Sequence, residues 1–82
     1  MTRDEMLVEL KAFVAEELLD GRDAGLDAHT PLLEWGVIDS LSVADLVAFT
    51  SHRFGIDVPQ DEVSPSNLRD LEAYTDLLVR LR

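Results

Sequence analysis

The chain has 82 residues, 46% of them hydrophobic, which suffices for one small globular domain and is too many for a disordered acidic tail. Its net charge of −10 at pH 7 repels phosphate groups, so we expect neither nucleic acid nor an anionic membrane as a partner. There is no cysteine, which excludes disulfides and thiolate metal sites, and any thioester chemistry needs a thiol supplied by a cofactor.

The charged N-terminal sequence does not resemble a signal peptide, and no stretch approaches the roughly 18 apolar residues of a membrane span. A cytoplasmic protein is therefore expected. Size and composition predict a single domain over residues 1–82, and we expect it to be a monomer.

The first predicted helix begins with Thr2 and Glu5, which have the spacing of a capping box. Apolar residues follow at helical spacing up to Leu18, and Gly21 is the predicted stop. A loop is then expected from about Asp20 to Ile38. Because such a loop is long for a compact domain, we expect its apolar residues to hold it to the core. These residues are Leu32, Leu33, Trp35, Val37 and Ile38.

Asp39 is a favourable N-cap for a second helix over residues 40–54, which Gly55 ends. Residues 60–63 predict one short helical turn. The last helix is predicted to begin at Ser66 or Asn67. Its apolar stripe contains Leu68, Leu71, Tyr74, Leu78 and Leu81. Because no segment shows the alternation of a β-strand, the predicted fold is all-α, a small bundle of three main helices and one short one.

The turn from Gly36 to Leu41 leads directly into the second helix and carries the candidate site. Ser40 is expected in the first turn of that helix, where backbone N–H groups lack helical partners and the helix dipole is positive. A phosphodiester on the Ser40 hydroxyl is favoured there, as free phosphate is at helix N-termini. Taken alone, however, an Asp-Ser pair at a helix start is most often simple capping chemistry.

The wider pattern over residues 30–71 resembles the carrier-protein family, the acyl and peptidyl carriers of fatty-acid, polyketide and nonribosomal peptide synthesis. The matching pieces are Thr30-Pro31-Leu32-Leu33, Gly36-Val37-Ile38-Asp39-Ser40-Leu41, Phe54-Gly55-Ile56, Val58-Pro59 and Asn67-Leu68-Arg69-Asp70-Leu71. The resemblance implies that Ser40 carries 4′-phosphopantetheine, which a separate magnesium-dependent phosphopantetheinyl transferase adds from coenzyme A. Asp39 would position this serine, and the chain itself would not be an enzyme.

The resemblance also implies that the helix after Ser40 is the main docking surface for partner enzymes. These are a ligase or acyltransferase that loads the arm, and enzymes that modify or transfer the cargo. The predicted docking residues are Glu34, Trp35, Leu41, Val43, Asp45, Ala48, Asp61 and Glu62. Many carriers have acidic residues near the end of that helix, whereas this chain has Ser51-His52-Arg53. Apolar contacts from Leu41 and Val43 are therefore expected to contribute more.

The segment Leu32-Leu33-Glu34-Trp35-Gly36 resembles stand-alone aminoacyl carriers, such as those that hold proline for pyrrole formation. It favours an amino acid or an amino-acid-derived acyl group as cargo over a long fatty chain. A free-standing carrier of a biosynthetic pathway, of the kind that makes secondary metabolites, is the function that this resemblance implies.

Two other classes of function stay open at this point. One is an acidic helical module that binds a basic protein and is never modified. The other is a hydrolase, which is disfavoured because Ser40 and His52, twelve residues apart on one helix, are separated by about 18 Å. His29 is not excluded by geometry, but the Gly-rich oxyanion loop of such enzymes is missing.

The remaining chemistry-bearing residues predict no metal site. Two histidines without cysteine do not form a zinc site, and the acidic loop lacks the ligand pattern of a calcium loop. That loop contains Asp20, Asp23 and Asp27. Core packing is favoured over contact with the cargo for both Trp35 and Tyr74, and partial exposure is predicted for Leu41.

Overall fold

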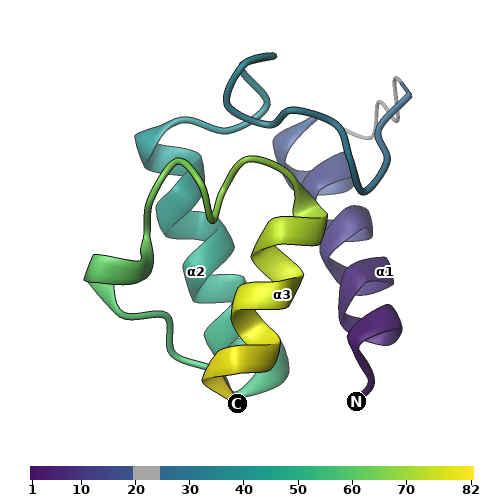
Figure 1. Ribbon diagram of the computed structural model, residues 1–82. Coiled ribbons are helices and arrows are strands. Elements are labelled where there is room, and N and C mark those ends of the chain that lie inside the picture. Colours follow the sequence, from purple (N-terminus) through teal and green to yellow (C-terminus); the bar gives the residue numbers. More distant parts are fainter. Residues whose placement is uncertain (20–24) are drawn as a thin grey trace.

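The computed structural model describes residues 1–19 and 25–82, which form helices and turns without a β-strand. Helix α1 (Arg3–Phe13) continues into the π-helical segment η1 (Val14–Leu18). It is followed by α2 (Ser40–Phe54), the 3₁₀ turn η2 (Gln60–Glu62) and α3 (Leu71–Leu81), as Figure 1 shows. The predicted all-α bundle of three main helices and one short one is confirmed. None of the helices in these two ranges is long and apolar enough to cross a membrane.

Helix α1 begins with the predicted capping box. The Glu5 amide donates to Thr2 Oγ1 at 3.2 Å, and the Thr2 amide donates to Glu5 Oε1 at 3.0 Å. Two of the N–H groups that a helix start leaves unsatisfied are thereby bonded. The predicted stop at Gly21 lies outside the described residues, as do Asp20 and Asp23 of the acidic loop.

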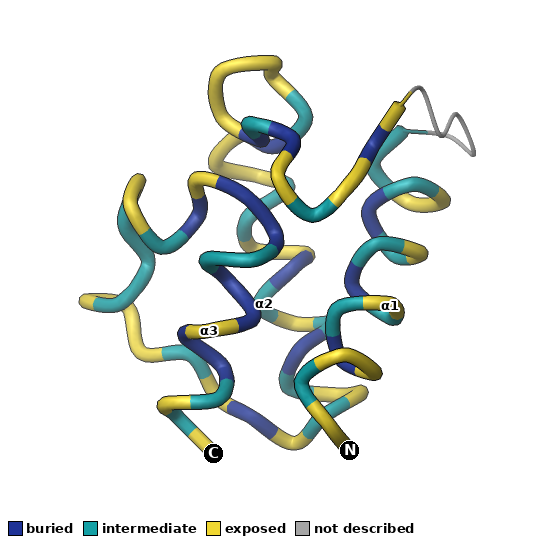
Figure 2. The backbone as a smooth tube through the Cα atoms, turned by 45° about the vertical axis from the view of Figure 1, so that its right-hand side comes forward, coloured by how far each residue is buried: buried dark blue, intermediate teal, exposed yellow. Residues whose placement is uncertain are grey.

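The core draws on all three main helices and on the segments between them (Figure 2). Its buried apolar side chains are Met6, Leu10, Val14, Leu26, Leu32, Ile38, Leu46, Ile56, Leu68, Leu71, Tyr74, Leu77 and Leu78. Helix α1 packs along α3. The loop between α1 and α2 contributes Leu26, Leu32 and Ile38, so it is held to the core, but the predicted contribution of Leu33 and Trp35 is wrong because both are exposed. Tyr74 is fully buried, which confirms its predicted core role.

Helix α3 begins at Leu71, so the predicted start at Ser66 or Asn67 is wrong. Asp70 is the N-cap, and its Oδ1 accepts from the Ala73 amide at 2.8 Å. Asn67 does not cap a helix because its side-chain amide bonds backwards, to the Glu62 carbonyl at 2.8 Å. Residues 65–68 form a turn instead.

Backbone hydrogen bonds fix the loop that precedes α2. The Leu32 amide donates to the Arg69 carbonyl at 2.9 Å, and the Glu72 amide donates to the Ala28 carbonyl at 3.1 Å. Both bonds join the loop to the segment that enters α3. The chain is therefore anchored a few residues before it turns into α2.

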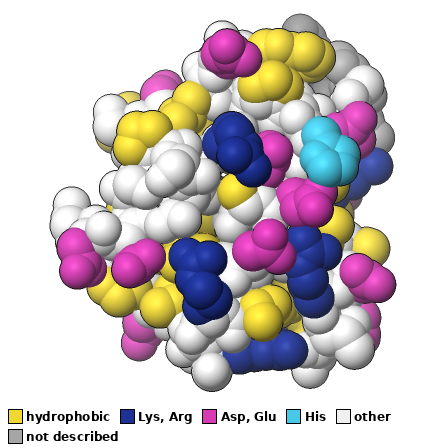
Figure 3. Space-filling view, viewed as in Figure 1, with side chains coloured by type: hydrophobic (Ala, Val, Ile, Leu, Met, Phe, Trp, Pro, Cys, Tyr) yellow, Lys and Arg dark blue, Asp and Glu magenta, His cyan; other side chains and the backbone are white. Residues whose placement is uncertain are grey.

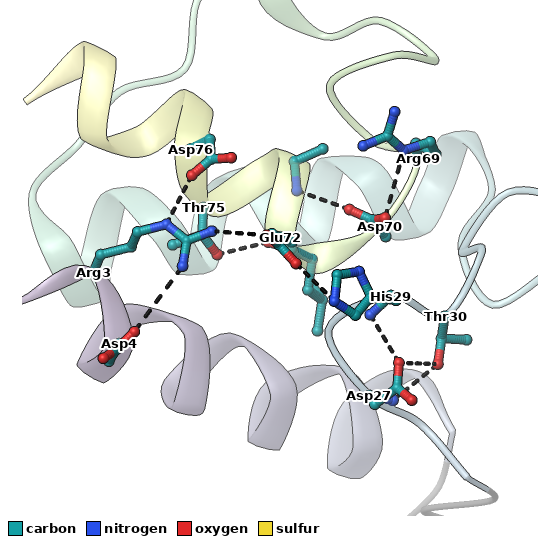
Figure 4. A network of polar contacts seen from close by, with 12 residues as sticks. Arg3, Asp4, Asp27, His29, Thr30, Arg69, Asp70, Glu72, Thr75 and Asp76 are labelled. Carbon is teal, nitrogen blue, oxygen red and sulfur yellow. Dashed lines mark hydrogen bonds and ion pairs between the residues drawn. The ribbon is translucent and has the colours of Figure 1, made fainter.

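A polar network reinforces this anchor at the start of α3 (Figure 4). His29 Nε2 lies 2.9 Å from Glu72 Oε2, and Arg3 of α1 reaches the same carboxylate at 3.7 Å. Within the loop, the Asp27 amide donates to Thr30 Oγ1 at 2.8 Å. Glu72 thus connects the loop, α1 and α3.

The two chain ends lie together at one end of the bundle (Figure 1). The Arg82 side chain donates to the Met1 carbonyl. Gly55, which ends α2 with a left-handed φ of 69°, lines the same hollow as Met1 and Arg82. Because α2 runs toward this end and finishes there, its first residue, Ser40, lies at the opposite end of the molecule.

Candidate functional site

Ser40 is the first residue of α2 and is exposed. The preceding residue, Asp39, has extended backbone angles, and its Oδ1 accepts from the Leu41 and Ser42 amides, each at 3.0 Å. The sequence folds this way because an aspartate at the N-cap satisfies first-turn N–H groups that have no helical acceptor. The cap therefore holds the Ser40 hydroxyl at the tip of a helix.

The charge at this helix tip differs from that of an anion-binding helix N-terminus, whose amides are free to bond a ligand. Hydrogen bonds from the amide and then the side chain of Ser42, with a smaller effect of the Leu41 amide, hold the pKa of Asp39 below its ordinary value, so this carboxylate is charged at neutral pH. Both of these first-turn amides are already bonded to Asp39, and its charge offsets the positive end of the helix dipole. The expectation of freely available amides beside Ser40 is thus only partly met. The site offers mainly an accessible hydroxyl.

A hollow of about 480 Å³ opens beside Ser40, between α2 and the segment around η2. It is lined by Ser40, Val43, Ala44, Val47, Val58, Gln60 and Val63. We call it the Ser40 groove. Four of its residues are valines, so it suits a slender chain with apolar and amide groups. Of these residues the sequence predicted only Ser40 and Val43, although the spacing of Val43 and Val47 on one helix side was a readable signal.

An apolar patch lies in the loop and helix around Ser40. Leu41 is 80% exposed, which is more than the partial exposure expected, and Leu33 is 40% exposed. Trp35 is 63% exposed, so its predicted core role is wrong. Figure 3 shows hydrophobic side chains gathered at the end of the molecule where this loop lies.

The conformation of the loop explains why Trp35 points outward. The Leu32 carbonyl accepts from both the Val37 and Ile38 amides, at 2.9 and 3.3 Å. Leu32 and Ile38 are buried at the two sides of this closed turn. The residues between them form its tip, and Gly36 adopts the left-handed φ of 70° that the tip requires.

The other predicted docking residues do not all lie on one exposed face. Glu34, Asp45, Ala48 and Asp61 are exposed, in the loop, on α2 and in η2. Val43 is half-buried and lines the Ser40 groove. Glu62 is also half-buried, and its Oε2 accepts from the Asn67 side chain at 3.2 Å. Leu41 directly follows Ser40, Glu34 and Trp35 lie in the loop that leads to it, and Asp61 and Glu62 belong to η2, on the other side of the groove.

The two histidines are not arranged to activate Ser40. His52 lies on the same helix, twelve residues further along and thus about 18 Å away. His29 contacts Glu72. In the described part of the chain, no three His, Asp or Glu side chains are grouped to hold a metal ion.

Comparison with protein families identifies the chain. Residues 8–75 match the family described as the phosphopantetheine attachment site. The chain belongs to this family. It is a carrier protein with covalently attached 4′-phosphopantetheine, a group that supplies the thiol absent from the cysteine-free sequence. An exposed hydroxyl at a helix tip beside an apolar groove fits such a group.

One curated relative supports this assignment of a carrier protein, and a chain in a solved structure shares the fold. The chain is 33% identical over 69 residues to the probable acyl carrier protein PigG of Serratia sp. (strain ATCC 39006), covering 84% of this chain and 79% of that protein. It is also similar to a chain in a solved structure titled "Crystal structure of FAD-dependent dehydrogenase". That match has a TM-score of 0.81 and 34% identity, and it covers 85% of this chain and 99% of the other.

Proposed function

We propose that Ser40 is the attachment residue and that the arm carries an amino acid or an amino-acid-derived acyl group as a thioester. The carrier would be free-standing, in a biosynthetic pathway of the secondary-metabolite kind, and would be a substrate of a phosphopantetheinyl transferase without catalysing a reaction itself. The observation that carries the assignment is the exposed Ser40 side chain at the first residue of α2.

The choice of Ser40 is supported by the other serine and threonine hydroxyls, because they are hydrogen-bonded within the chain or are at least partly buried. Ser51 donates to Asp57 at 2.8 Å, and Ser64 and Ser66 bond each other. Thr2 is a helix cap, whereas Thr30, Thr50 and Thr75 are buried. Ser42 is half-buried on the side of α2 behind Ser40. Ser40 is thus the described hydroxyl that a transferase reaches most directly.

The size of the matched crystal chain supports an FAD-dependent dehydrogenase as one partner enzyme. The match covers 99% of that chain with 85% of this 82-residue protein, so the matched chain is itself the size of a carrier. A chain of this length holds one small core and leaves no room for an FAD-binding enzyme. We therefore infer that a carrier accompanies the dehydrogenase of that title. On this carrier, such a partner would remove a hydride and a proton from the cargo and reduce FAD to FADH₂.

Charge and exposure suggest how partners dock near Ser40. The segments around the Ser40 groove and its preceding loop carry carboxylates at Glu34, Asp39, Asp45, Asp61 and Glu62. One exposed cation, Arg69, lies in the segment whose backbone bonds that loop. With Trp35 and Leu41 exposed beside Ser40, the surface suits a partner that has an apolar socket and a basic rim. Val43 and Glu62 belong to the periphery of this surface, whereas Ala48 lies about two turns beyond Ser40 on another side of α2.

The attachment is tested by incubating the protein with coenzyme A, magnesium and a promiscuous phosphopantetheinyl transferase, followed by intact mass spectrometry. We expect the mass of one arm to be added to the wild type and to Ser42→Ala, and none to Ser40→Ala. Modification of Ser40→Ala would refute the assignment. A wild type that stays unmodified would favour the competing function, an acidic interaction module.

The cargo is tested separately on the modified protein. The arm is loaded with L-proline or with a straight-chain fatty acyl group, and each form is mixed with an FAD-dependent dehydrogenase encoded beside the carrier gene. We expect hydrogens to be lost from the prolyl form alone, two for each FAD that is reduced. Oxidation of the fatty acyl form instead would contradict the proposed cargo and leave the attachment residue unaffected.

A further inference from the structure

A second groove runs along the other side of α2, between that helix and α1–η1. It consists of two adjoining hollows of about 290 and 430 Å³. The hollows share Phe13, Glu17 and Phe49, so they form one continuous surface, which we call the α1–α2 groove. At 100° per residue, its α2 residue Ala48 faces a different side of the helix from Val43 and Val47 of the Ser40 groove.

The floor of the α1–α2 groove is aromatic. The rings of Phe13 and Phe49 stack with centroids 4.3 Å apart, and Phe54 meets Phe49 edge-on at 5.8 Å. Phe13 and Phe49 are only half-buried, and they are not among the buried residues of the core. The neighbouring Ala12 and Ala48 are exposed and have methyl side chains, which leave the rings accessible. Accessible aromatic surface of this kind is typical of binding sites.

Carboxylates border this floor on both sides. Glu16 and Glu17 lie on η1 and are exposed, and Asp45 lies on α2. Glu9 also lines the groove, where its carboxylate pairs with Arg53 at 2.7 Å. A ligand that fits this arrangement has large apolar side chains along one face and cations on both flanks of that face. An amphipathic basic helix has this pattern.

We propose that the α1–α2 groove docks a short basic amphipathic helix of a partner enzyme, as a second docking surface independent of the attachment residue. Its apolar face would cover the stacked Phe13 and Phe49 rings, and its arginines or lysines would meet Glu17 and Asp45. From Glu9 to Glu17, the groove extends about 12 Å along α1–η1, which matches two to three turns of a helix. A partner held there leaves Ser40 and Trp35 uncovered.

The proposal is tested with the unmodified protein and a fluorescein-labelled synthetic peptide of about 14 residues, about four helical turns. The peptide has leucine and phenylalanine along one helical face and arginine on both flanks. Fluorescence anisotropy gives the affinity, and ¹H–¹⁵N chemical shifts locate the peptide. We expect the largest shifts at Ala12, Phe13, Ala48 and Phe49. Since Ser40→Ala should bind equally well, failure of arm attachment and failure of this docking site are distinguishable.

Two exposed alanines of α2 provide a matched pair of variants. Ala48→Gln fills the α1–α2 groove without changing charge, and we expect it to weaken the peptide about tenfold. Ala44→Gln makes the same change in the Ser40 groove, one helical turn before Ala48, and should weaken the peptide less than Ala48→Gln does. Circular dichroism confirms that both variants stay folded.

A second pair separates docking from general charge attraction. Glu17→Arg and Asp61→Arg change the net charge equally, and only Glu17 borders the α1–α2 groove. We expect Glu17→Arg to weaken the peptide at least about fivefold more than Asp61→Arg. The proposal would be overturned if the two variants of either pair changed the peptide affinity equally. It would also be overturned by chemical-shift changes centred on Trp35 and Leu41, or by the absence of peptide binding. Self-association of the chain that Ala48→Gln abolishes would overturn it too, because a second copy would then occupy the groove.

Discussion

The hydroxyl oxygens of Thr50 and Tyr74 lie 2.8 Å apart in the core and join α2 to α3. Thr50 Oγ1 donates its single hydrogen to the Leu46 carbonyl, also at 2.8 Å. The Tyr74 hydroxyl must therefore donate to Thr50. Both side chains are fully buried, so this chain of two hydrogen bonds is shielded from water.

The direction of these hydrogen bonds predicts unequal costs of mutation. Thr50→Val leaves the Tyr74 hydroxyl as a buried donor without an acceptor and should lower the free energy of unfolding by about 1–3 kcal/mol. Tyr74→Phe keeps the bond from Thr50 to Leu46 and should cost about 1 kcal/mol. Because the double variant removes the orphaned donor, it should be more stable than Thr50→Val alone in urea denaturation. Simple addition of the two single costs would contradict this assignment of donors.

The same tyrosine predicts a loss of stability in alkali. Burial raises the pKa of Tyr74. The folded chain therefore keeps this proton at a pH where the unfolded chain has lost it, above the ordinary pKa of about 10. The raised pKa of Tyr74 adds to the free energy of unfolding in full below that pH, and this stabilisation declines as the pH rises further. Urea midpoints measured from about pH 8 to 11.5 should fall less steeply in Tyr74→Phe than in the wild type.

The cap of α3 gives a test of where this helix begins. Asp70→Ala removes the acceptor of the Ala73 amide and should cost about 0.5–2 kcal/mol, whereas Asp70→Ser should retain most of the stability. Ser66→Ala is the control, because Ser66 is exposed and lies before the helix. It should change the free energy of unfolding by less than about 0.5 kcal/mol. The opposite order of effects would place the helix start at Ser66.

Trp35 is the single tryptophan of the chain, so its fluorescence reports the apolar patch. With 63% of the side chain exposed, we expect red-shifted emission and efficient quenching by acrylamide in the free carrier. Trp35→Ala should alter the free energy of unfolding by less than about 0.5 kcal/mol. If Trp35 is an anchor for partners, the same change should lower kcat/KM of a carrier-dependent enzyme on the order of tenfold. A blue emission and a large loss of stability would show a buried ring.

Local chemistry made much of this fold predictable. Asp39 and Gly55 mark the two ends of α2 because each satisfies a requirement of a helix terminus, an acceptor for first-turn amides and a left-handed residue at the end. The capping box of Thr2 and Glu5 worked in the same way. The position of Ser40 at a helix tip followed directly from its neighbour, Asp39.

What the sequence did not reveal depends on contacts between distant residues. Asn67 resembles a cap, but its amide is drawn to Glu62, and Asp70 caps the helix instead. Trp35 is hydrophobic and was expected inside, yet the closed turn between Leu32 and Ile38 leaves it at the tip. Both grooves along α2 are formed with residues from other segments. The spacing of Val43 and Val47 marks one side of the helix, but no pattern within α2 indicates which segment faces that side.

The separation of Ser40 from the chain ends has a practical consequence. Fifteen helical residues, about 22 Å, lie between this serine and the pole where both termini emerge. A purification tag, a resin or a fused protein joined to either terminus would lie at the end of the molecule opposite Ser40. It would therefore not obstruct an enzyme that approaches this serine. Because both termini lie at that end, the domain could also be inserted into a larger polypeptide while the phosphopantetheine arm on Ser40 still faces solvent.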